Sequence, residues 1–190
     1  MSDALNVTQA PVIFSHSGAR ALVDVPRNVP DSIMRRVTTN GGVVMVPFVT
    51  GFVSPAVMLY DQSTRPVFTD LQAKYGKDTA AITRELKQWR VSHPEPHATL
   101  AQVADQIDYV RKVAGVDHVV IGGDFDGITE VVQGLEDVSK YPALFAELAR
   151  RGWSDADLKK LAGENLLRVF SQAEAVAKRL QAQSAVHSRR

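Results

Sequence analysis

The sequence predicts an α/β fold built on a short parallel sheet, because three buried strand-like runs alternate with helical segments. The runs are PVIFSHS (residues 11–17), GGVVMVPF (41–48) and HVVIGGDFDG (118–127). Each is short, rich in β-branched residues and bounded by Gly or Pro, which is typical of strands that are buried on both faces. Such strands are joined by crossover helices and therefore run parallel.

Two helices are expected between these strands. The segment 27–40 (RNVPDSIMRRVTTN) predicts a short helix that Asp31 caps, with its apolar residues on one face. The run 99–115 (TLAQVADQIDYVRKVAG) predicts a longer helix, because Thr99 and Gln102 have the spacing of a capping box. Its apolar side chains recur every three or four residues, as on the buried face of an amphipathic helix.

Two further helices are expected after the third strand. The segment 141–152 (YPALFAELARRG) predicts a short helix that ends at Gly152. The segment 154–180 begins with Ser154 and has Asp157 three residues later, which predicts an N-terminal cap and one long amphipathic helix. The whole pattern indicates strands and helices in alternation along one domain.

The sheet expected from these runs is incomplete. A doubly wound sheet has about five strands or more and an eight-stranded barrel needs about 250 residues, whereas this chain has 190. We expect residues 1–182 to form a partial domain with an exposed strand edge that another element must cover. Within it, residues 51–97 form an insertion of the kind used for functional loops or lids, with a helical stretch at 70–90, and residues 183–190 form a polar tail.

Charge and cysteine usage exclude several function classes. Lys and Arg number 22 against 21 Asp and Glu, so the net charge of +1 gives no reason to expect a nucleic-acid surface. No apolar run approaches the roughly 20 residues of a membrane span. As the chain stands we expect a soluble, cytoplasmic protein, and a periplasmic one if an upstream leader is missing. Because cysteine is absent, any bound metal must be held by His, Asp or Glu.

Polar side chains follow the first and third strands, and parallel strands direct such groups to one common edge. His16 ends the first strand, where its imidazole can bind a metal or make a local hydrogen bond. Asp124 and Asp126 end the third strand within GGDFDG, whose glycines allow a sharp turn. A carboxylate there can transfer a proton beside a metal, or it can bond local amides in an Asx turn.

Arg27 lies in the loop after His16, within the segment RNVPD. Its guanidinium can bind a substrate carboxylate through two parallel hydrogen bonds, which lysine does less well. The alternative is a solvated surface charge without a ligand. From the residues alone, both interpretations stay open.

Together these segments resemble the renal (membrane) dipeptidase family, the zinc metallopeptidases of family M19. The resemblance rests on blocks that occur in the family's order: PVIFSHSGAR, RNVPD, GGVVMVPF, GGDFDG, GLEDVSKYPALFAELARRGW and GENLLRVF. It implies that the fold is the C-terminal part of a metal-dependent-hydrolase (β/α)8 barrel, with about three parallel strands and their helices. The implied activity is hydrolysis of the peptide bond of dipeptides at a site that holds two Zn2+ ions when complete.

The resemblance also implies roles for three residues. His16 corresponds to a zinc ligand, Asp124 to the carboxylate at the metal centre that transfers a proton, and Arg27 to the arginine that binds the substrate's C-terminal carboxylate. The family's HxD pair, its bridging glutamate and its other histidine ligand have no counterpart here. Phe52 stands at a position where the family often has tyrosine.

Three hypotheses follow. The first is a zinc-dependent dipeptidase, at the level of the family, with a dipeptide as substrate. The second is a catalytically inactive fragment or a half-barrel that depends on a partner, either a second copy in a homodimer or the missing N-terminal half. The third is another amide or lactone hydrolase on the same barrel. Because only His16 is a clear metal ligand, we expect this chain on its own to bind zinc weakly and to have little activity.

Overall fold

A parallel three-stranded sheet in the order β1-β2-β3 forms the centre of the molecule. The computed structural model describes residues 1–187, with side chains described through residue 184. The strands are β1 (Ile13–Phe14), β2 (Val43–Pro47) and β3 (Val119–Gly123), and both pairings are parallel. The predicted α/β class and the three parallel strands are thus confirmed. The first strand is shorter than the predicted run 11–17, because the chain turns at residues 15–16.

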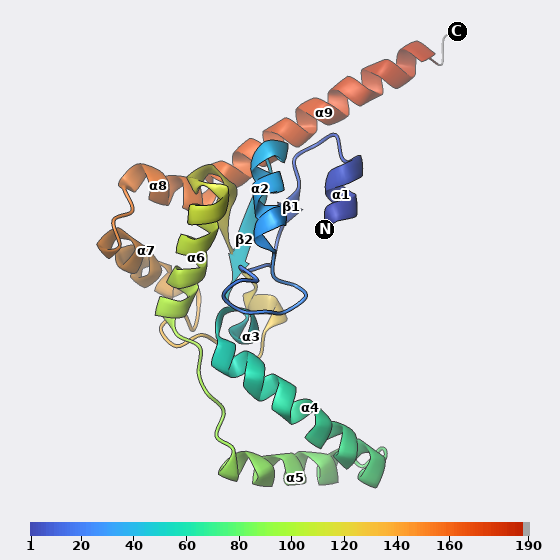
Figure 1. Cartoon of the computed structure of the whole chain (residues 1–190), viewed down its shortest axis with the longest axis vertical. Coiled ribbons are helices and arrows are strands. Elements are labelled where there is room, and N and C mark those ends of the chain that lie inside the picture. The colour runs from blue at the N-terminus through green and yellow to red at the C-terminus, as the bar shows by residue number, and fades with distance from the viewer. Residues whose placement is uncertain (188–190) are drawn as a thin grey trace.

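Helices α2 (Asp31–Asn40) and α6 (Leu100–Ala114) cover one face of the sheet, as Figure 1 shows. Alternate residues of the strands point to that face, where they meet the apolar sides of the two helices. Burying each such side chain contributes about 1.5–3 kcal/mol. The central members of this core are fully buried: Met34, Val37, Val44, Val46, Val103, Ile107, Val110 and Val119.

The ends of these two helices test the predicted caps. The capping box of Thr99 and Gln102 is present at the start of α6. Asp31, however, does not cap α2, because it is the first helical residue and Pro30 occupies the cap position. Its Oδ2 atom instead accepts a hydrogen bond of 3.0 Å from the Tyr109 hydroxyl, which links α2 to α6.

On the opposite face of the sheet, the start of helix α9 (Asn165–His187) packs against the strands. Leu166 and Val169 of that helix pack against the other set of alternating strand residues, namely Ile13, Val43, Met45 and Val120. Beyond this contact α9 extends well past the sheet (Figure 1). Of the expected polar tail 183–190, residues 183–187 belong to α9 and 188–190 lie outside the described residues.

Between β3 and α9 the chain forms α7 (Tyr141–Arg150), α8 (Asp155–Lys159) and a π-helical turn (Lys160–Glu164). The predicted Ser154 cap is present as a capping box with Asp157. The single long helix predicted over 154–180 is wrong, because the π-helical turn kinks at Gly163 (φ 172°, ψ −22°) and separates α8 from α9.

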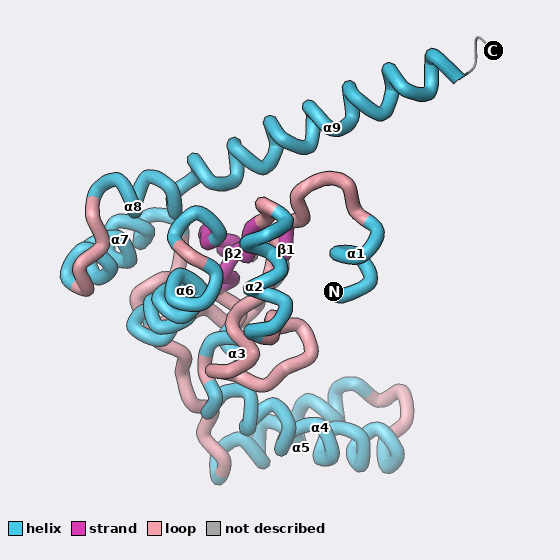
Figure 2. The backbone as a smooth tube through the Cα atoms, turned by 45° about the horizontal axis from the view of Figure 1, so that its top comes forward, coloured by secondary structure: helices cyan, strands magenta, loops and turns pink. Residues whose placement is uncertain are grey.

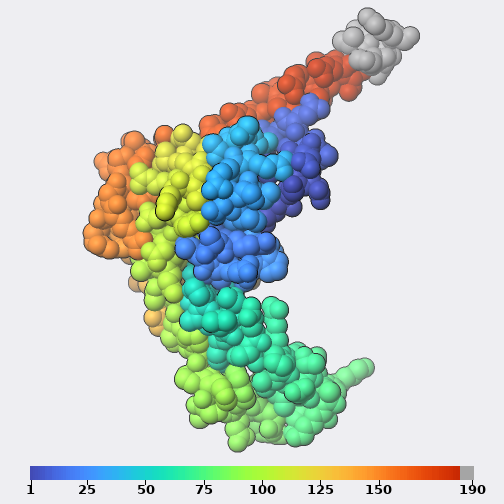
Figure 3. Space-filling model, viewed as in Figure 1, coloured from blue at the N-terminus to red at the C-terminus, as the bar shows by residue number. Residues whose placement is uncertain are grey.

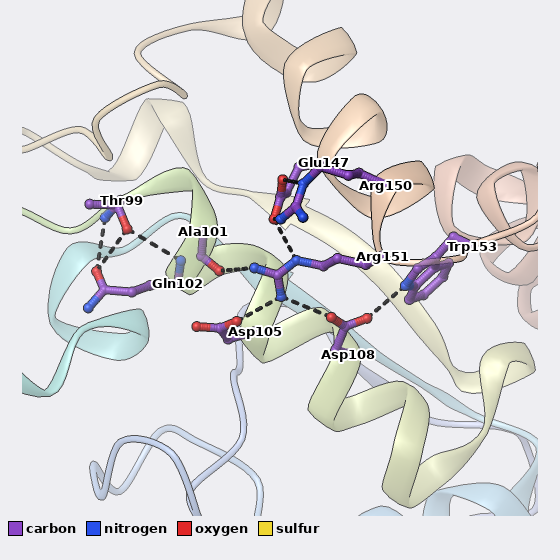
Figure 4. A network of polar contacts seen from close by, with 9 residues as sticks. All are labelled: Thr99, Ala101, Gln102, Asp105, Asp108, Glu147, Arg150, Arg151 and Trp153. Carbon is purple, nitrogen blue, oxygen red and sulfur yellow. Dashed lines mark hydrogen bonds and ion pairs between the residues drawn. The ribbon is translucent and has the colours of Figure 1, made fainter.

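An ionic network fastens α7 to α6, and Figure 4 shows its members. The Arg151 guanidinium donates to Asp105 and Asp108 on α6 and to Glu147 on α7, at distances of 2.7–2.9 Å. The Trp153 Nε1 atom donates to Asp108 at 2.7 Å. Because one arginine bonds to both helices, the network fixes how α7 lies against α6.

The insertion 51–97 forms a helical arm. It contains most of α3 (Thr50–Val53), then α4 (Pro55–Tyr75) and α5 (Thr79–Ser92). Helices α4 and α5 pack side by side and stand away from the sheet, so they form a separate lobe in Figures 2 and 3. The helical stretch predicted at 70–90 is therefore two helices, separated at Gly76, whose φ of 58° suits a left-handed turn.

The remaining elements are short. They are α1 (Ser2–Val7) and the 3-10 turns η1 (Val116–His118), η2 (Phe125–Gly127) and η3 (Val138–Lys140). Among the helices that the structure describes, we find none with the length and apolar character to cross a bilayer.

Candidate active site

The structure brings His16 and Asp124 together at the C-terminal edge of the sheet. The His16 Nε2 atom lies 3.8 Å from the Asp124 Oδ1 atom. The two residues follow β1 and β3, which are the outer strands, so β2 lies between the elements that carry them. The expectation that both side chains share one edge is therefore met, and they are close enough for direct electrostatic interaction.

Gly122 explains how side chains of two outer strands come so close. A Cβ atom at this position would lie 2.6 Å from the Ser15 carbonyl oxygen and 3.0 Å from the Met45 carbonyl oxygen. In protein structures a Cβ atom essentially never lies as close as 2.6 Å to a main-chain oxygen. The missing side chain thus allows the ends of all three strands to converge, and His16 and Asp124 extend from that convergence.

Asp124 has a backbone conformation that side chains seldom adopt. Its φ of 77° is the only positive value among the described non-glycine residues, and such a conformation costs about 1–3 kcal/mol. Gly123 precedes it with φ 55°, so the chain turns sharply as the strand ends. A Cβ on Gly127 would lie 2.5 Å from the Asp124 Oδ1 atom, so the turn leaves room for this carboxylate.

Three aromatic rings lie behind this turn. The rings of Phe48, Phe125 and Tyr141 have centroids 5.5–6.2 Å apart, within the usual range for aromatic pairs. The Phe48 amide donates to the Gly123 carbonyl at 2.8 Å, which joins the end of β2 to the turn. Burial raises the pKa of the Tyr141 phenol. The turn that carries Asp124 therefore rests on a packed apolar support.

The Nε2 atom of the His16 ring is directed toward Asp124. Its Nδ1 atom is 2.9 Å from the Ser15 hydroxyl, and 37% of its side chain is exposed. Asp126, the other aspartate of the predicted pair, is exposed and makes no side-chain hydrogen bond or ion pair among the described residues. The structure thus pairs His16 with Asp124 and leaves Asp126 outside the pair.

The donor set at this edge fits only part of a metal site. A catalytic zinc normally has about three protein ligands. Within the described part of the chain, no group of three or more His, Cys, Asp or Glu side chains could hold a metal ion. His16 offers an imidazole nitrogen and Asp124 a carboxylate, so further ligands are needed to complete a site.

Arg27 lies on a closed loop that follows His16, formed by residues 18–29 and called the arginine loop below. A parallel bridge between Ala19 and Val29 closes the loop at its base. Arg20 lies within the loop and donates to the Val25 and Pro26 carbonyls at 3.2 and 2.7 Å. Arg27 is exposed, and its guanidinium lies 5.7 Å from the centroid of the Phe52 ring. Arg20 therefore stabilises the loop, whereas Arg27 faces outward from it.

Asn28 and Gln106 are two buried residues that the sequence interpretation did not single out. Both are fully buried and make side-chain hydrogen bonds to the arginine loop and to Phe52. A signal for Gln106 exists in the sequence, because this amide lies on the otherwise apolar face of the helix 100–114, one residue before Ile107. A polar side chain at a core position normally has specific hydrogen-bond partners.

Comparison with known sequences gives a match over nearly the whole chain. Residues 1–184 match the family described as membrane dipeptidase (peptidase family M19). An uncharacterised dipeptidase of Schizosaccharomyces pombe is 41% identical over 175 residues, which cover 92% of this chain and 34% of that protein. The chain thus spans about a third of the length of this curated relative.

Solved structures share the fold. The probable dipeptidase PvdM from Pseudomonas aeruginosa has a TM-score of 0.70 and 31% identity, over 90% of this chain and 47% of that one. A metallopeptidase from Rhodobacter sphaeroides, solved with a phosphinate mimic of the dipeptide L-Ala-D-Ala, has a TM-score of 0.66 and 23% identity, over 90% and 38%. In both cases this chain corresponds to less than half of the solved protein.

Proposed function

This chain belongs to the membrane dipeptidase family, peptidase family M19, and on that premise we propose that the complete protein is a zinc-dependent dipeptidase. The predicted family is confirmed, as is the predicted fold, a part of a (β/α)8 barrel of which this chain supplies three parallel strands. Two of the solved neighbours, one of them the Rhodobacter sphaeroides protein, are metallopeptidases, and together with the family this implies a metal cofactor. Zinc, the dipeptide substrate and the residue roles below are proposals.

The juxtaposition of His16 and Asp124 carries this proposal. His16 presents its Nε2 atom as a metal ligand, and the Asp124 Oδ1 atom lies 3.8 Å from it. Asp124 accepts a proton from the attacking water and delivers it to the leaving amine, because a carboxylate at a metal centre can serve as both base and acid. When bound, the metal supplies Lewis-acid activation of the peptide carbonyl.

Arg27 is proposed to bind the free C-terminal carboxylate of the substrate. Its exposed guanidinium, on a loop that leaves the same strand as His16, has the planar donor geometry that carboxylates accept in pairs. If Arg27 holds the C-terminal carboxylate, the peptide bond that reaches the hydrolytic centre is the one before the last residue. A free dipeptide offers this carboxylate and its single peptide bond together.

The experiment uses a protein in which an upstream segment supplies the remaining metal ligands. Unmodified dipeptides and C-terminally amidated analogues are offered with zinc, and hydrolysis is followed by chromatography. We expect turnover of the free dipeptides, its loss in Asp124→Asn, and a strong preference for the free carboxylate that disappears in Arg27→Ala. Unchanged turnover in Asp124→Asn would remove this residue from the mechanism.

A second candidate is a catalytically inactive half-barrel that acts only with a partner. It is favoured by the incomplete donor set within the described residues and by the positions of β1 and β3, each of which has just one neighbouring strand in the sheet. A cooperative thermal transition that zinc does not raise, together with absent turnover in the extended protein, would favour this candidate.

A further inference from the structure

We propose that Asn28 and Gln106 form an amide clamp that positions Arg27 and Phe52 relative to His16. The clamp is defined as these two side chains, and the role given to Arg27 rests on the proposed function. Asn28 belongs to the arginine loop and Gln106 to helix α6, and each side chain is fully buried. They are positioning residues, because their side chains bond to the main chain of the arginine loop and of Phe52 rather than to a substrate.

The two amides fix the start of the arginine loop. The Asn28 Oδ1 atom accepts a hydrogen bond from the Gly18 amide at 2.7 Å. The Gln106 Oε1 atom accepts one from the Ala19 amide at 2.6 Å. Gly18 and Ala19 lie two and three residues after His16, so the two side chains fix the path of the main chain directly beyond the candidate metal ligand.

The side chains of Asn28 and Gln106 also form hydrogen bonds with the main chain of Phe52. The Phe52 carbonyl oxygen accepts from Asn28 Nδ2 at 2.9 Å and from Gln106 Nε2 at 3.3 Å. Asn28 Nδ2 also donates to the Val23 carbonyl at 2.9 Å, across the arginine loop. One carbonyl therefore joins three segments: the arginine loop, the start of the helical arm and α6. The Arg27 guanidinium packs over the ring of this residue.

The chemistry requires an amide at both positions. Each side chain accepts from one main-chain N–H and donates to the Phe52 carbonyl, a combination that an amide supplies and a carboxylate does not. Gly18 supports the same geometry, because a Cβ there would lie 2.8 Å from Gln106 Oε1 and 3.0 Å from Asn28 Oδ1. Both oxygens thus occupy the space that a side chain would need.

The first test measures amide hydrogen exchange in the full chain by mass spectrometry. Gln106→Leu removes one acceptor and one donor. Ile107→Val is the matched control, because it loosens the same helix at a fully buried apolar side chain, which can form no hydrogen bond with the clamp. We expect exchange in peptides covering residues 18–29 to accelerate by about tenfold or more in Gln106→Leu and to stay as in the wild type in the control. Equal exchange in the two variants would overturn the proposal.

The second test uses the hydrolytically competent extended protein. Gln106→Leu should raise KM for a free dipeptide about tenfold and leave kcat within about twofold, because the carboxylate contact is misplaced while the His16–Asp124 pair is intact. For an amidated dipeptide KM should not change. If the clamp only stabilised the fold, both substrates would be affected alike, which would contradict the proposal.

If the wild type hydrolyses neither substrate, the dipeptidase assignment fails. The hydrogen-exchange experiment still decides whether the clamp holds the loop.

Discussion

The Nε2 atom of His16 lies 3.8 Å from the Oδ1 atom of Asp124, although β2 separates the strands that these residues follow. Both side chains are partly exposed, at 37% and 28%, so a third group can reach them. The pair thus combines a nitrogen donor with a carboxylate at an accessible edge of the sheet. Such an arrangement suits metal-assisted hydrolysis. It depends on the absence of side chains at Gly122, where the strand ends converge, and at Gly127, which faces the Asp124 carboxylate.

Gly122→Ala should destabilise the chain by about 1–3 kcal/mol, because overpacking forces the backbone to shift. The added Cβ would lie 2.6 Å from a main-chain oxygen of Ser15, which cannot rotate away as a side chain can. Gly51→Ala is the control, since it lies in helix α3 and a Cβ there would meet only the end of the exposed Asp61 side chain, which can rotate away. Urea unfolding measures both variants. Equal stability in the two would show that the strand ends do not converge as described.

Acidification should weaken the ionic network at the end of α7, where Glu147 accepts hydrogen bonds from Arg150 and Arg151. Hydrogen bonds from Arg150 and then Arg151 lower the pKa of Glu147 from 4.5 to about 2. A carboxyl whose pKa is lower in the folded state stabilises the fold fully above its unfolded pKa, and the contribution is lost as the pH falls from 4.5 through about 2.

Thermal melts across that range should therefore show a steeper loss of stability in the wild type than in Glu147→Gln. Glu130→Gln serves as a control, because it removes a carboxylate from an exposed loop residue. Parallel pH curves for the wild type and Glu147→Gln would mean that the ionic network is not formed in solution.

The sequence predicts best what depends on near neighbours in the chain. The capping boxes at Thr99 and Ser154 were visible because each needs two residues three positions apart. The common edge for His16 and Asp124 followed from the parallel strands, but their separation depends on Gly122 fitting under main-chain atoms of two other strands. Gln106 stands out locally as an amide on an apolar helix face, but its partner does not, because Ala19 is 87 positions away.

The helical arm was only partly predicted for a related reason. The apolar residues of 51–97 have no strong helical periodicity, since α4 and α5 pack mainly against each other and expose most of their surface. Pro55 occupies the first turn of α4, where a proline fits, and Pro66 is tolerated inside that helix, so neither proline marks a helix boundary between residues 55 and 75. Local signals therefore gave the wrong boundaries.

This chain on its own should bind zinc weakly. Within the described residues His16 and Asp124 offer two donor groups, fewer than the three or so protein ligands of a catalytic zinc. Calorimetry on the purified chain is the measurement, and a thermal melt with and without zinc is its companion. Stoichiometric binding at sub-micromolar affinity, with a raised melting temperature, would contradict the expectation and point to ligands that the geometry does not reveal.

Gly127→Ala should abolish most hydrolytic activity in the extended protein while leaving its stability nearly unchanged. The new Cβ would lie 2.5 Å from the Asp124 Oδ1 atom, at the end of a side chain that can rotate away at little cost. The carboxylate would then leave its position beside His16, and proton transfer would lose its geometry, which lowers the rate by about a hundredfold or more.

Gly122→Ala is the control, because its added Cβ would collide with main-chain oxygens and should lower stability first. Steady-state kinetics and thermal melts on both variants separate the two effects. A Gly127→Ala protein with wild-type kcat would show that the position of the Asp124 carboxylate is not what hydrolysis requires.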